Sequence, residues 1–191
     1  MMKVGLYFGS FNPIHTGHLI VASHVLNETG IKKVWFIVSP QNPLKSSPSL
    51  LNENHRIRLV RMALEDDFRF VASNVEFELP RPSYTINTLT YLQEKYSTYK
   101  FFVIMGSDSF LNLPNWKNHE AILDNYSIVI YERPGFPVDK SSLPANISLL
   151  KAPYLDISST YIRSLIKEGK NTIYLLPEKV REAIDGAGYY R

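Results

Sequence analysis

Cysteine is absent from the 191 residues of this sequence. Its absence excludes disulfides, thiolate nucleophiles, iron–sulfur clusters and thiolate zinc sites, so the chemistry must come from histidine, carboxylate or hydroxyl groups. Long apolar runs are absent too, because no stretch approaches the roughly 20 residues that a membrane-spanning helix needs. The apolar start, residues 1–9, is too short and too broken by glycine for a signal peptide. We therefore expect a cytoplasmic protein without a membrane partner.

The sequence also lacks a block of charge of one sign. Lys plus Arg number 21 and Asp plus Glu number 18, which gives a net charge of +3 at pH 7. Residues 45–61 hold four Lys or Arg and one acid, whereas residues 62–80 hold five acids and one Arg. Because segments of opposite sign alternate, no continuous basic stripe is available to follow a nucleic-acid backbone. We therefore expect no nucleic-acid partner, although local anion sites are compatible with this pattern.

Hydrophobic residues make up 45% of the chain, which is enough for one domain with a sizeable core. Short β-branched and aromatic runs predict strands, and apolar residues at helical spacing between them predict helices. The expected strands are residues 4–8, 34–38, 71–79 (one strand, or two joined by a kink), 101–105, 127–131 and 147–150. The expected helices are residues 16–29, 53–65, 84–96, 119–123, 158–168 and 177–185, and the expected surface loop is residues 136–146. The alternation predicts an α/β fold with a doubly wound, mainly parallel, Rossmann-like sheet and a small helical C-terminal lobe over about residues 155–191.

The first strand–helix junction, residues 9–18, is the first candidate site. In an open α/β sheet, ligands bind outside the carboxyl ends of the strands, and a helix N-terminus at that place suits phosphate. Gly9 and Gly17 permit close backbone approach or a positive φ. His15 and His18 are three residues apart, so both side chains can reach the same spot from the entry to the helix.

The residues of this junction leave several explanations open. The spacing of a dinucleotide-binding Gly-x-Gly-x-x-Gly fingerprint is absent, and a zinc site would need ligands beyond the two histidines. Two ordinary surface or capping histidines beside a turn would also explain the pattern. We expect no protein-held metal here.

The whole segment Gly-Ser-Phe-Asn-Pro-Ile-His-Thr-Gly-His, residues 9–18, resembles a signature of the nucleotidyltransferase superfamily. In that superfamily the two histidines stabilise the transferring α-phosphate of a nucleoside triphosphate. Asn12 stands where many members carry Asp, and this change keeps the turn chemistry. The resemblance implies that His15 and His18 are catalytic and that this loop binds ATP through Gly9, Ser10, Phe11, His15 and His18.

A second segment, Ile-Ser-Ser-Thr-Tyr-Ile-Arg at residues 157–163, precedes and opens a predicted helix. On the residues alone, Ser158 or Ser159 is a helix cap, and Arg163 lies one turn further on, where it can meet a phosphate. The segment resembles the superfamily motif that holds the β and γ phosphates. The resemblance implies a catalytic Arg163 and further ATP contacts from Ile157, Ser158 and Ser159.

Three segments in the middle of the chain resemble the bacterial nicotinate-mononucleotide adenylyltransferases of this superfamily. They are Pro-Ser-Tyr-Thr-Ile-Asn-Thr-Leu at residues 82–89, Met-Gly-Ser-Asp-Ser-Phe-Leu-Asn-Leu-Pro-Asn-Trp at residues 105–116 and Glu-Arg-Pro-Gly at residues 132–135. The resemblance implies a nicotinate ring stacked on an indole, with its carboxylate held by backbone N–H groups. The implied substrate-binding residues are Tyr84, Thr85, Trp116 and Lys117.

The resemblance also implies roles for four other residues. Asp108 stands where the family meets the adenosine ribose, and Gly106 before it is a further implied ATP contact. Lys45 and Arg133 are implied contacts of the substrate phosphate. Without the resemblance, a loop-anchoring Trp116, a helix-capping Asp108 and a solvated Arg133 are adequate explanations. Leu44 precedes Lys45 where the family usually has His, so one expected phosphate donor is missing.

Together these segments predict an enzyme that joins the AMP moiety of ATP to nicotinate mononucleotide and releases pyrophosphate. The 5′-phosphate of the mononucleotide attacks the α-phosphorus without a general base, because its second pKa of about 6 leaves it ionised at pH 7. The expected cofactor is Mg²⁺ bound with the ATP phosphates. Two alternatives stay open: transfer to nicotinamide mononucleotide or another phosphate acceptor, and a regulatory nucleotide-binding module without turnover. The sequence also leaves a homo-oligomer open.

Overall fold

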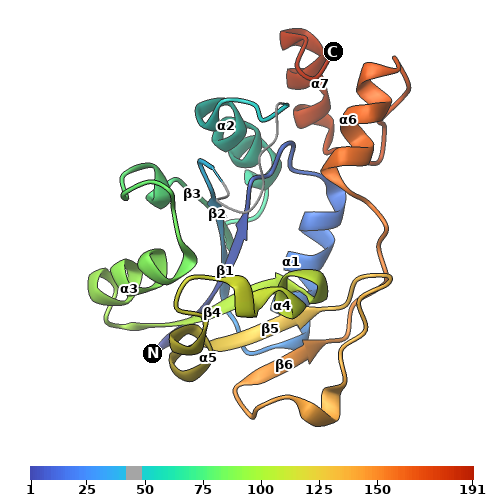
Figure 1. Ribbon diagram of the computed structural model, residues 1–191. Helices are drawn as coiled ribbons and strands as arrows, with labels where there is room; N and C mark the ends of the chain where they lie inside the picture. Colours follow the sequence, from blue (N-terminus) through green and yellow to red (C-terminus); the bar gives the residue numbers. More distant parts are fainter. Residues whose placement is uncertain (42–48) are drawn as a thin grey trace.

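The computed structural model describes residues 1–41 and 49–191 and contains a six-stranded sheet in the order β3-β2-β1-β4-β5-β6 (Figure 1). Every neighbouring pair of strands is parallel. The strands are β1 (Met2–Gly9), β2 (Lys33–Val38), β3 (Phe70–Ser73), β4 (Tyr99–Gly106), β5 (Ser127–Tyr131) and β6 (Ile147–Leu150). This order is that of a doubly wound Rossmann-like sheet, so the predicted fold class is confirmed.

Helices lie at the predicted places, and the structure adds the short helix α4 (Ser107–Leu111), which the sequence did not predict. The α-helices are α1 (Thr16–Glu28), α2 (Glu53–Leu64), α3 (Thr85–Lys95), α4 (Ser107–Leu111), α5 (His119–Asn125), α6 (Ser159–Lys167) and α7 (Glu178–Ala187). The described residues also form the 3₁₀ turns η1 (Val75–Phe77), η2 (Leu113–Asn115) and η3 (Lys140–Ser142). The last of these lies inside the predicted loop 136–146, where Asp139 caps it by accepting from the Ser141 N–H.

The prediction of strand over residues 71–79 is wrong in its second half. β3 ends at Ser73 and the turn η1 follows. The alternation of apolar and polar residues suggested a strand, but Val75 packs on one apolar cluster and Phe77 on the other. Between them Glu76 is buried and accepts a hydrogen bond from the Thr88 hydroxyl at 2.8 Å. The turn therefore places the two apolar side chains on different faces of the sheet.

The core lies on both faces of the sheet. Along β1 and β2, neighbouring residues alternate between two apolar clusters: Leu6 and Ile37 belong to one, Tyr7 and Phe36 to the other. Because side chains point to opposite faces at every second residue, both faces are covered and the strands are continuous apolar runs. Helices α1, α2, α6 and α7 contribute to the Tyr7 cluster, whereas α3 and α5 contribute to the Leu6 cluster.

The order of the strands determines where a ligand can bind. β1 has β2 on one side and β4 on the other, so the connections turn in opposite directions from it. A crevice is expected outside the carboxyl ends at this switch point. Within residues 1–41 and 49–191, none of the helices has both the length and the apolarity needed to cross a bilayer.

Candidate active site

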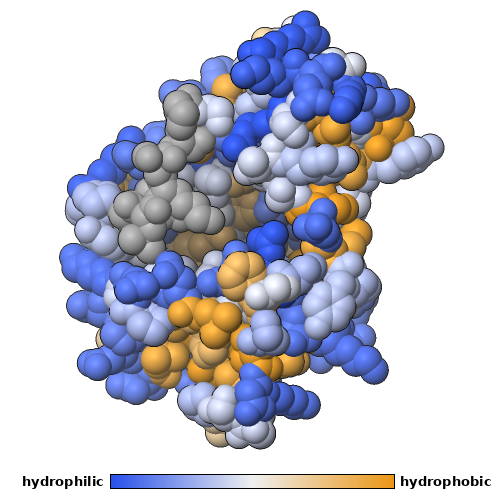
Figure 2. All heavy atoms as spheres, turned by 45° about the vertical axis from the view of Figure 1, so that its right-hand side comes forward, coloured by the Kyte–Doolittle hydropathy of each residue, from blue (hydrophilic) through white to orange (hydrophobic). Residues whose placement is uncertain are grey.

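A cavity of about 710 Å³ lies at the carboxyl edge of β1 and β5, beside the first turns of α1, α4 and α6. Figure 2 shows a face of the molecule that is hollowed near its centre, with hydrophilic side chains around much of the rim. The structure brings eleven of the predicted site residues to the lining of this cavity: Gly9, Ser10, Phe11, His15, His18, Asp108, Arg133, Ile157, Ser158, Ser159 and Arg163.

The loop between β1 and α1 is tightly packed and locally strained. Phe11 has φ +44°, a left-handed conformation that side-chain-bearing residues rarely adopt. Its buried ring meets the His18 ring edge-on, with 5.0 Å between the centroids. A Cβ on Gly9 would lie 3.0 Å from this ring, and neither Gly9 nor Gly17 has a positive φ. Of the two reasons expected for these glycines, close approach is therefore the one that applies.

The two signature histidines stack on each other at the start of α1. Their ring centroids are 3.7 Å apart and the planes are 28° from parallel. The His15 N–H donates to Nδ1 of His18 at 3.2 Å, so a neutral His18 carries its proton on Nε2. Gly17 leaves room for this pair, because a Cβ there would lie 3.0 Å from His15 Nδ1.

Burial keeps both imidazoles neutral. Together with the smaller effect of the nearby Arg133 guanidinium, it lowers the pKa of His15 to about 3. The pKa of His18 is held well below its usual value, first by burial and then by the charges of His15 and Arg133. Neutral imidazoles in this position are hydrogen-bond donors to an anion without being fixed cations.

The second signature is bonded directly to the first. Ser158 caps α6 by accepting from the Tyr161 N–H at 3.2 Å, while the Ser159 hydroxyl donates to the Pro13 carbonyl at 2.8 Å. Arg163 donates from Nη1 to the Asn12 carbonyl, also at 2.8 Å. The first turn of α6 therefore lies against the β1–α1 loop, although the two segments are about 150 residues apart in the sequence.

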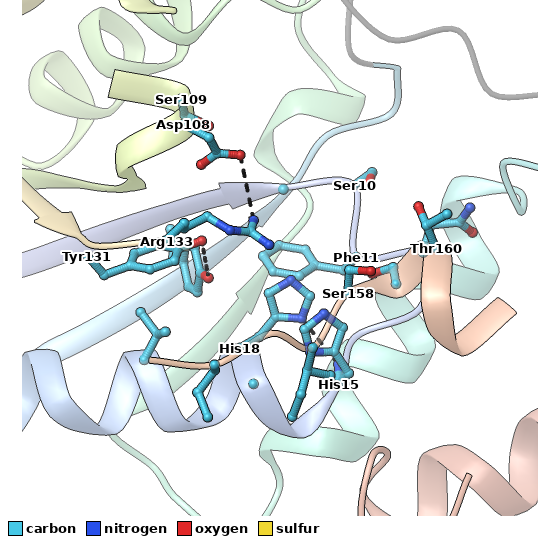
Figure 3. A pocket seen from close by; sticks show the side chains of 18 of the residues that line it. Ser10, Phe11, His15, His18, Asp108, Ser109, Tyr131, Arg133, Ser158 and Thr160 are labelled. Atoms are coloured by element: carbon cyan, nitrogen blue, oxygen red, sulfur yellow. Dashed lines mark hydrogen bonds and ion pairs between the residues drawn. The ribbon is translucent and has the colours of Figure 1, made fainter. Parts of the chain in front are cut away.

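Asp108 and Arg133 form the opposite side of the cavity (Figure 3). Their side chains approach to 3.7 Å between Nη1 and Oδ2, and each is about 30% exposed. Oδ1 of Asp108 is buried without a hydrogen-bond partner among the described residues. Gly106, rather than Asp108, is the N-cap of α4, and it does not line the cavity. A Cβ on Gly106 would lie 2.9 Å from Cδ of Arg133, so this glycine lets the strand end approach the pair.

The predicted acceptor-binding residues form a separate group. Tyr84 is the N-cap of α3, Thr85 is its first residue and Trp116 ends the turn η2. Nζ of Lys117 lies 4.5 Å from the centroid of the Tyr84 ring, which connects the two segments. None of these four residues lines the cavity described above. Lys45 lies outside the described residues.

Arg56 is a residue of this region that sequence reasoning missed. It is fully buried in α2, yet among the described residues its guanidinium donates to main-chain carbonyls and to no side chain. The acceptors are the carbonyls of Ser10, Ser39, Pro40 and Leu51. A signal was present, because Arg56 precedes Leu59, Val60 and Ala63 by three, four and seven residues and so lies on the apolar stripe of the helix.

Asn12, within the β1–α1 loop, also forms several hydrogen bonds to distant segments. Its Oδ1 accepts from the Leu51 N–H at 3.1 Å and from the Tyr190 hydroxyl at 2.9 Å. Its Nδ2 donates to the Ser49 carbonyl at 3.0 Å. An aspartate could not make this last bond, so the Asn at this position has a role beyond the turn.

The chain is similar over nearly its whole length to proteins of known sequence. The cytidylyltransferase-like family matches residues 6–165. A probable nicotinate-nucleotide adenylyltransferase of Cytophaga hutchinsonii is 47% identical over 189 residues, covering 99% of this chain and 98% of that protein. One of Flavobacterium psychrophilum is 46% identical, with complete coverage of both.

Solved structures show the same fold. The Plasmodium falciparum nicotinic acid mononucleotide adenylyltransferase complexed with NaAD matches with a TM-score of 0.85 and 20% identity, covering 100% of this chain and 98% of that one. The same enzyme complexed with APC matches with a TM-score of 0.83. By its full-length likeness to these relatives, the chain belongs to the cytidylyltransferase-like family and, within it, to the nicotinate-nucleotide adenylyltransferases.

Proposed function

We propose that this protein transfers the AMP moiety of ATP to nicotinate mononucleotide, forming nicotinate adenine dinucleotide and pyrophosphate in NAD biosynthesis. The observation that carries the proposal is the pair of neutral, stacked histidines facing the start of α6 across one cavity. Helix N-termini and a guanidinium around such a pair suit a chain of phosphates. The amino-acid sequences of the relatives support the same activity.

The ATP phosphates lie between the two signatures in this proposal. His18, and His15 beside it, donate to the α-phosphate, and Ser10 and the main chain of residues 9–11 contact the same nucleotide. The first turn of α6 and Arg163 hold the β and γ phosphates. Because Arg163 also bonds the Asn12 carbonyl, the group that binds the leaving pyrophosphate is fixed relative to the loop that binds the reacting phosphorus.

The reaction is a direct displacement. An oxygen of the mononucleotide 5′-phosphate forms a bond to the α-phosphorus while the bond from that phosphorus to the bridging oxygen breaks, and the electron pair leaves with pyrophosphate. The phosphate monoester is already ionised at pH 7, so the chain need not supply a base. Catalysis then consists of alignment and stabilisation of charge on the phosphate oxygens.

Asp108 and Arg133 serve the two nucleotides in different ways. The partly exposed carboxylate of Asp108 is an acceptor for a ribose hydroxyl of the adenosine. The Arg133 guanidinium is a donor for the mononucleotide phosphate. Trp116 stacks on the nicotinate ring, and the main chain at Thr85 and Lys117, beside Tyr84, holds its carboxylate.

Mg²⁺ is proposed as the cofactor that enters with ATP. No cluster of three or more His, Asp or Glu side chains suited to a metal ion occurs in the described part of the chain. This donor set fits an ion carried mainly by phosphate oxygens and water, as Mg²⁺ commonly is. When bound, the ion neutralises charge on the phosphates, and the residues named above position them.

In this proposal the chain is a single domain, and the helical lobe of about residues 155–191 completes the cavity. Its α6 supplies Arg163, and the Tyr190 hydroxyl beyond α7 bonds Asn12 in the signature loop. A lobe that folded separately would not contribute these contacts.

One assay tests the proposal against its alternatives. Pyrophosphate release from Mg-ATP is measured in parallel with nicotinate mononucleotide, nicotinamide mononucleotide and a plain ribose 5-phosphate. Faster release with the carboxylate form supports the proposal. Faster release with the amide form would make nicotinamide mononucleotide the substrate. If the protein binds ATP but releases pyrophosphate with none of the acceptors, it is a regulatory module.

A further inference from the structure

Two tyrosine hydroxyls meet beside the phosphate cavity. Tyr131, the last residue of β5, and Tyr7 of β1 both line the cavity, and Tyr7 is the deeper of the two, packed in the core with 4% of its surface exposed. The Tyr7 hydroxyl donates to the Tyr131 hydroxyl at 3.1 Å, and the two rings are edge-on with centroids 6.0 Å apart. None of the roles described above involves either side chain.

The number of protons in this pair leaves one donor unused. Each hydroxyl carries one proton, and a single hydrogen bond between them consumes only one. Among the described residues neither hydroxyl has another hydrogen-bond acceptor, and Tyr131 is the member that is donated to. The remaining O–H therefore belongs to Tyr131, which faces the cavity.

The surroundings of Tyr131 favour an anionic acceptor. Arg133 and Asp108 lie beside it, as Figure 3 shows, and the Tyr7 ring meets the His18 ring edge-on at 5.9 Å. Gly106 makes room for the phenol, because a Cβ there would lie 3.2 Å from Cζ of Tyr131. The free O–H therefore opens into the same space as the guanidinium and the two imidazoles, which are donors to phosphate.

The protonation of this pair does not depend on pH in the neutral range. Burial raises the pKa of Tyr131, while the hydrogen bond from Tyr7 and the charge of Arg133 act in the opposite direction. Burial likewise raises the pKa of Tyr7, with the Tyr131 hydroxyl adding to the effect. Both hydroxyls therefore stay protonated wherever the substrate phosphate is ionised.

We propose that Tyr131 is a further substrate-contacting residue, whose hydroxyl donates a hydrogen bond to a phosphate oxygen in the cavity, and that Tyr7 orients it from behind. This inference rests on the proposed function, since it needs a phosphate in the cavity. Both substrates carry phosphate, and the kinetic constants of the variants below tell which one Tyr131 meets.

The test compares Tyr131→Phe with Tyr7→Phe in the full-length protein. Both changes break the same hydrogen bond and keep both rings, but only the first removes the hydroxyl whose proton is not already donated within the pair. We expect Tyr131→Phe to lower kcat/KM by about tenfold or more, because a donor to a charged phosphate is lost. Tyr7→Phe should lower it by about threefold or less, because the donor remains and only its orientation is loosened. A rise in KM for ATP alone, or for the mononucleotide alone, identifies the phosphate that is bound.

The double variant adds a readout that a purely structural role would not produce. If Tyr7 acts through Tyr131, the double variant is no slower than Tyr131→Phe. Equal losses in the two single variants would overturn the proposal, as would a folded Tyr131→Phe protein with kcat and both KM values within about twofold of the wild type. If Tyr131→Phe lowers the thermal midpoint more than Tyr7→Phe does, calorimetric binding of ATP and of nicotinate mononucleotide replaces turnover, and unchanged affinity for both substrates again overturns the proposal. Absence of pyrophosphate release by the wild-type protein would instead count against the proposed function.

Discussion

The phosphate cavity and the predicted acceptor group are built in different ways. Around the cavity, hydrogen bonds of 2.8 Å join residues from opposite ends of the chain, such as Arg163 to Asn12 and Ser159 to Pro13. In the acceptor group, the two segments meet where the Lys117 ammonium lies over the Tyr84 ring. The first region is held by the fold before any ligand arrives, whereas the second offers side-chain surfaces. A phosphate chain needs fixed donors, but an aromatic ring needs only a flat partner.

His18→Ala should have the largest effect on turnover. Loss of one positioned donor to developing charge commonly costs about 10²–10³ in turnover, roughly 2.7–4 kcal/mol. We expect a fall of this size in kcat with the fold retained, measured as pyrophosphate release beside circular dichroism. Near-normal turnover in a folded variant would contradict the role given to the histidine pair. His24→Ala is the matched control, since His24 lies on α1 outside the cavity.

Arg56→Met should have the next largest effect, which is on the stability of the fold rather than on turnover. It would leave four main-chain carbonyls without their donor, and each buried group left unpaired costs about 1–3 kcal/mol. We expect the free energy of unfolding in urea to fall by about 3 kcal/mol or more. Arg56→Lys should recover part of it, because an ammonium has three donors but no planar fork.

The exposed Arg61 on the same helix provides the control for that change. Arg61→Met should alter the free energy of unfolding by less than about 0.5 kcal/mol, as substitutions at the surface usually do. Equal effects of the two changes would show that the carbonyl bonds of Arg56 do not hold the cavity together. The cavity would then not differ from the acceptor group in being held by hydrogen bonds of the fold.

Lowering the pH should decrease the free energy of unfolding by a smaller amount, through His15 in the cavity wall. The pKa of His15 is about 3 in the folded protein and about 6.5 in the unfolded chain, so the unfolded state binds more protons between these values. The stability is therefore full above pH 6.5 and is lost as the pH falls towards 3. At pH 5 this one histidine should lower the free energy of unfolding by about 2 kcal/mol relative to pH 7.5. Urea unfolding at both pH values, for the wild type and His15→Gln, measures the difference, and an equal pH dependence in the two proteins would contradict the assignment.

The sequence predicted the sheet well because both of its faces are covered. Continuous apolar runs with turn residues after them are sufficient to locate buried parallel strands. The error at residues 74–79 arose because a period of two is also compatible with a turn that sends Val75 and Phe77 to opposite faces. A periodic pattern does not distinguish these cases when the partner elements are unknown.

The site was predictable only in part, for a related physical reason. His15, His18 and Arg163 lie in local segments with a characteristic residue pattern, and the structure brings them to one cavity. The contacts of Arg56, Tyr131 and Asn12 depend on tertiary neighbours. Because every residue has a main-chain carbonyl, the sequence does not indicate which carbonyl accepts a hydrogen bond. Such positioning interactions become visible only when distant segments are placed side by side.

Trp116→Ala should have the smallest effect and should separate the two regions. Stacking of an aromatic ring on a cationic pyridinium is worth about 1–2 kcal/mol, so KM for the mononucleotide should rise about tenfold while KM for ATP stays within about twofold. Trp116→Phe should restore part of the affinity, because a flat ring remains.

The second tryptophan makes a direct measurement of this stacking feasible. The chain has two tryptophans, and Trp35 lies in β2 among Tyr96, Tyr99 and Phe101. In a Trp35→Phe protein, fluorescence excited at wavelengths that the twelve tyrosines do not absorb comes from Trp116 alone. We expect nicotinate mononucleotide to quench it and ATP to leave it nearly unchanged. Equal quenching by both ligands would mean that Trp116 belongs to the phosphate region after all, because a side chain that meets only the pyridine ring cannot report the binding of ATP.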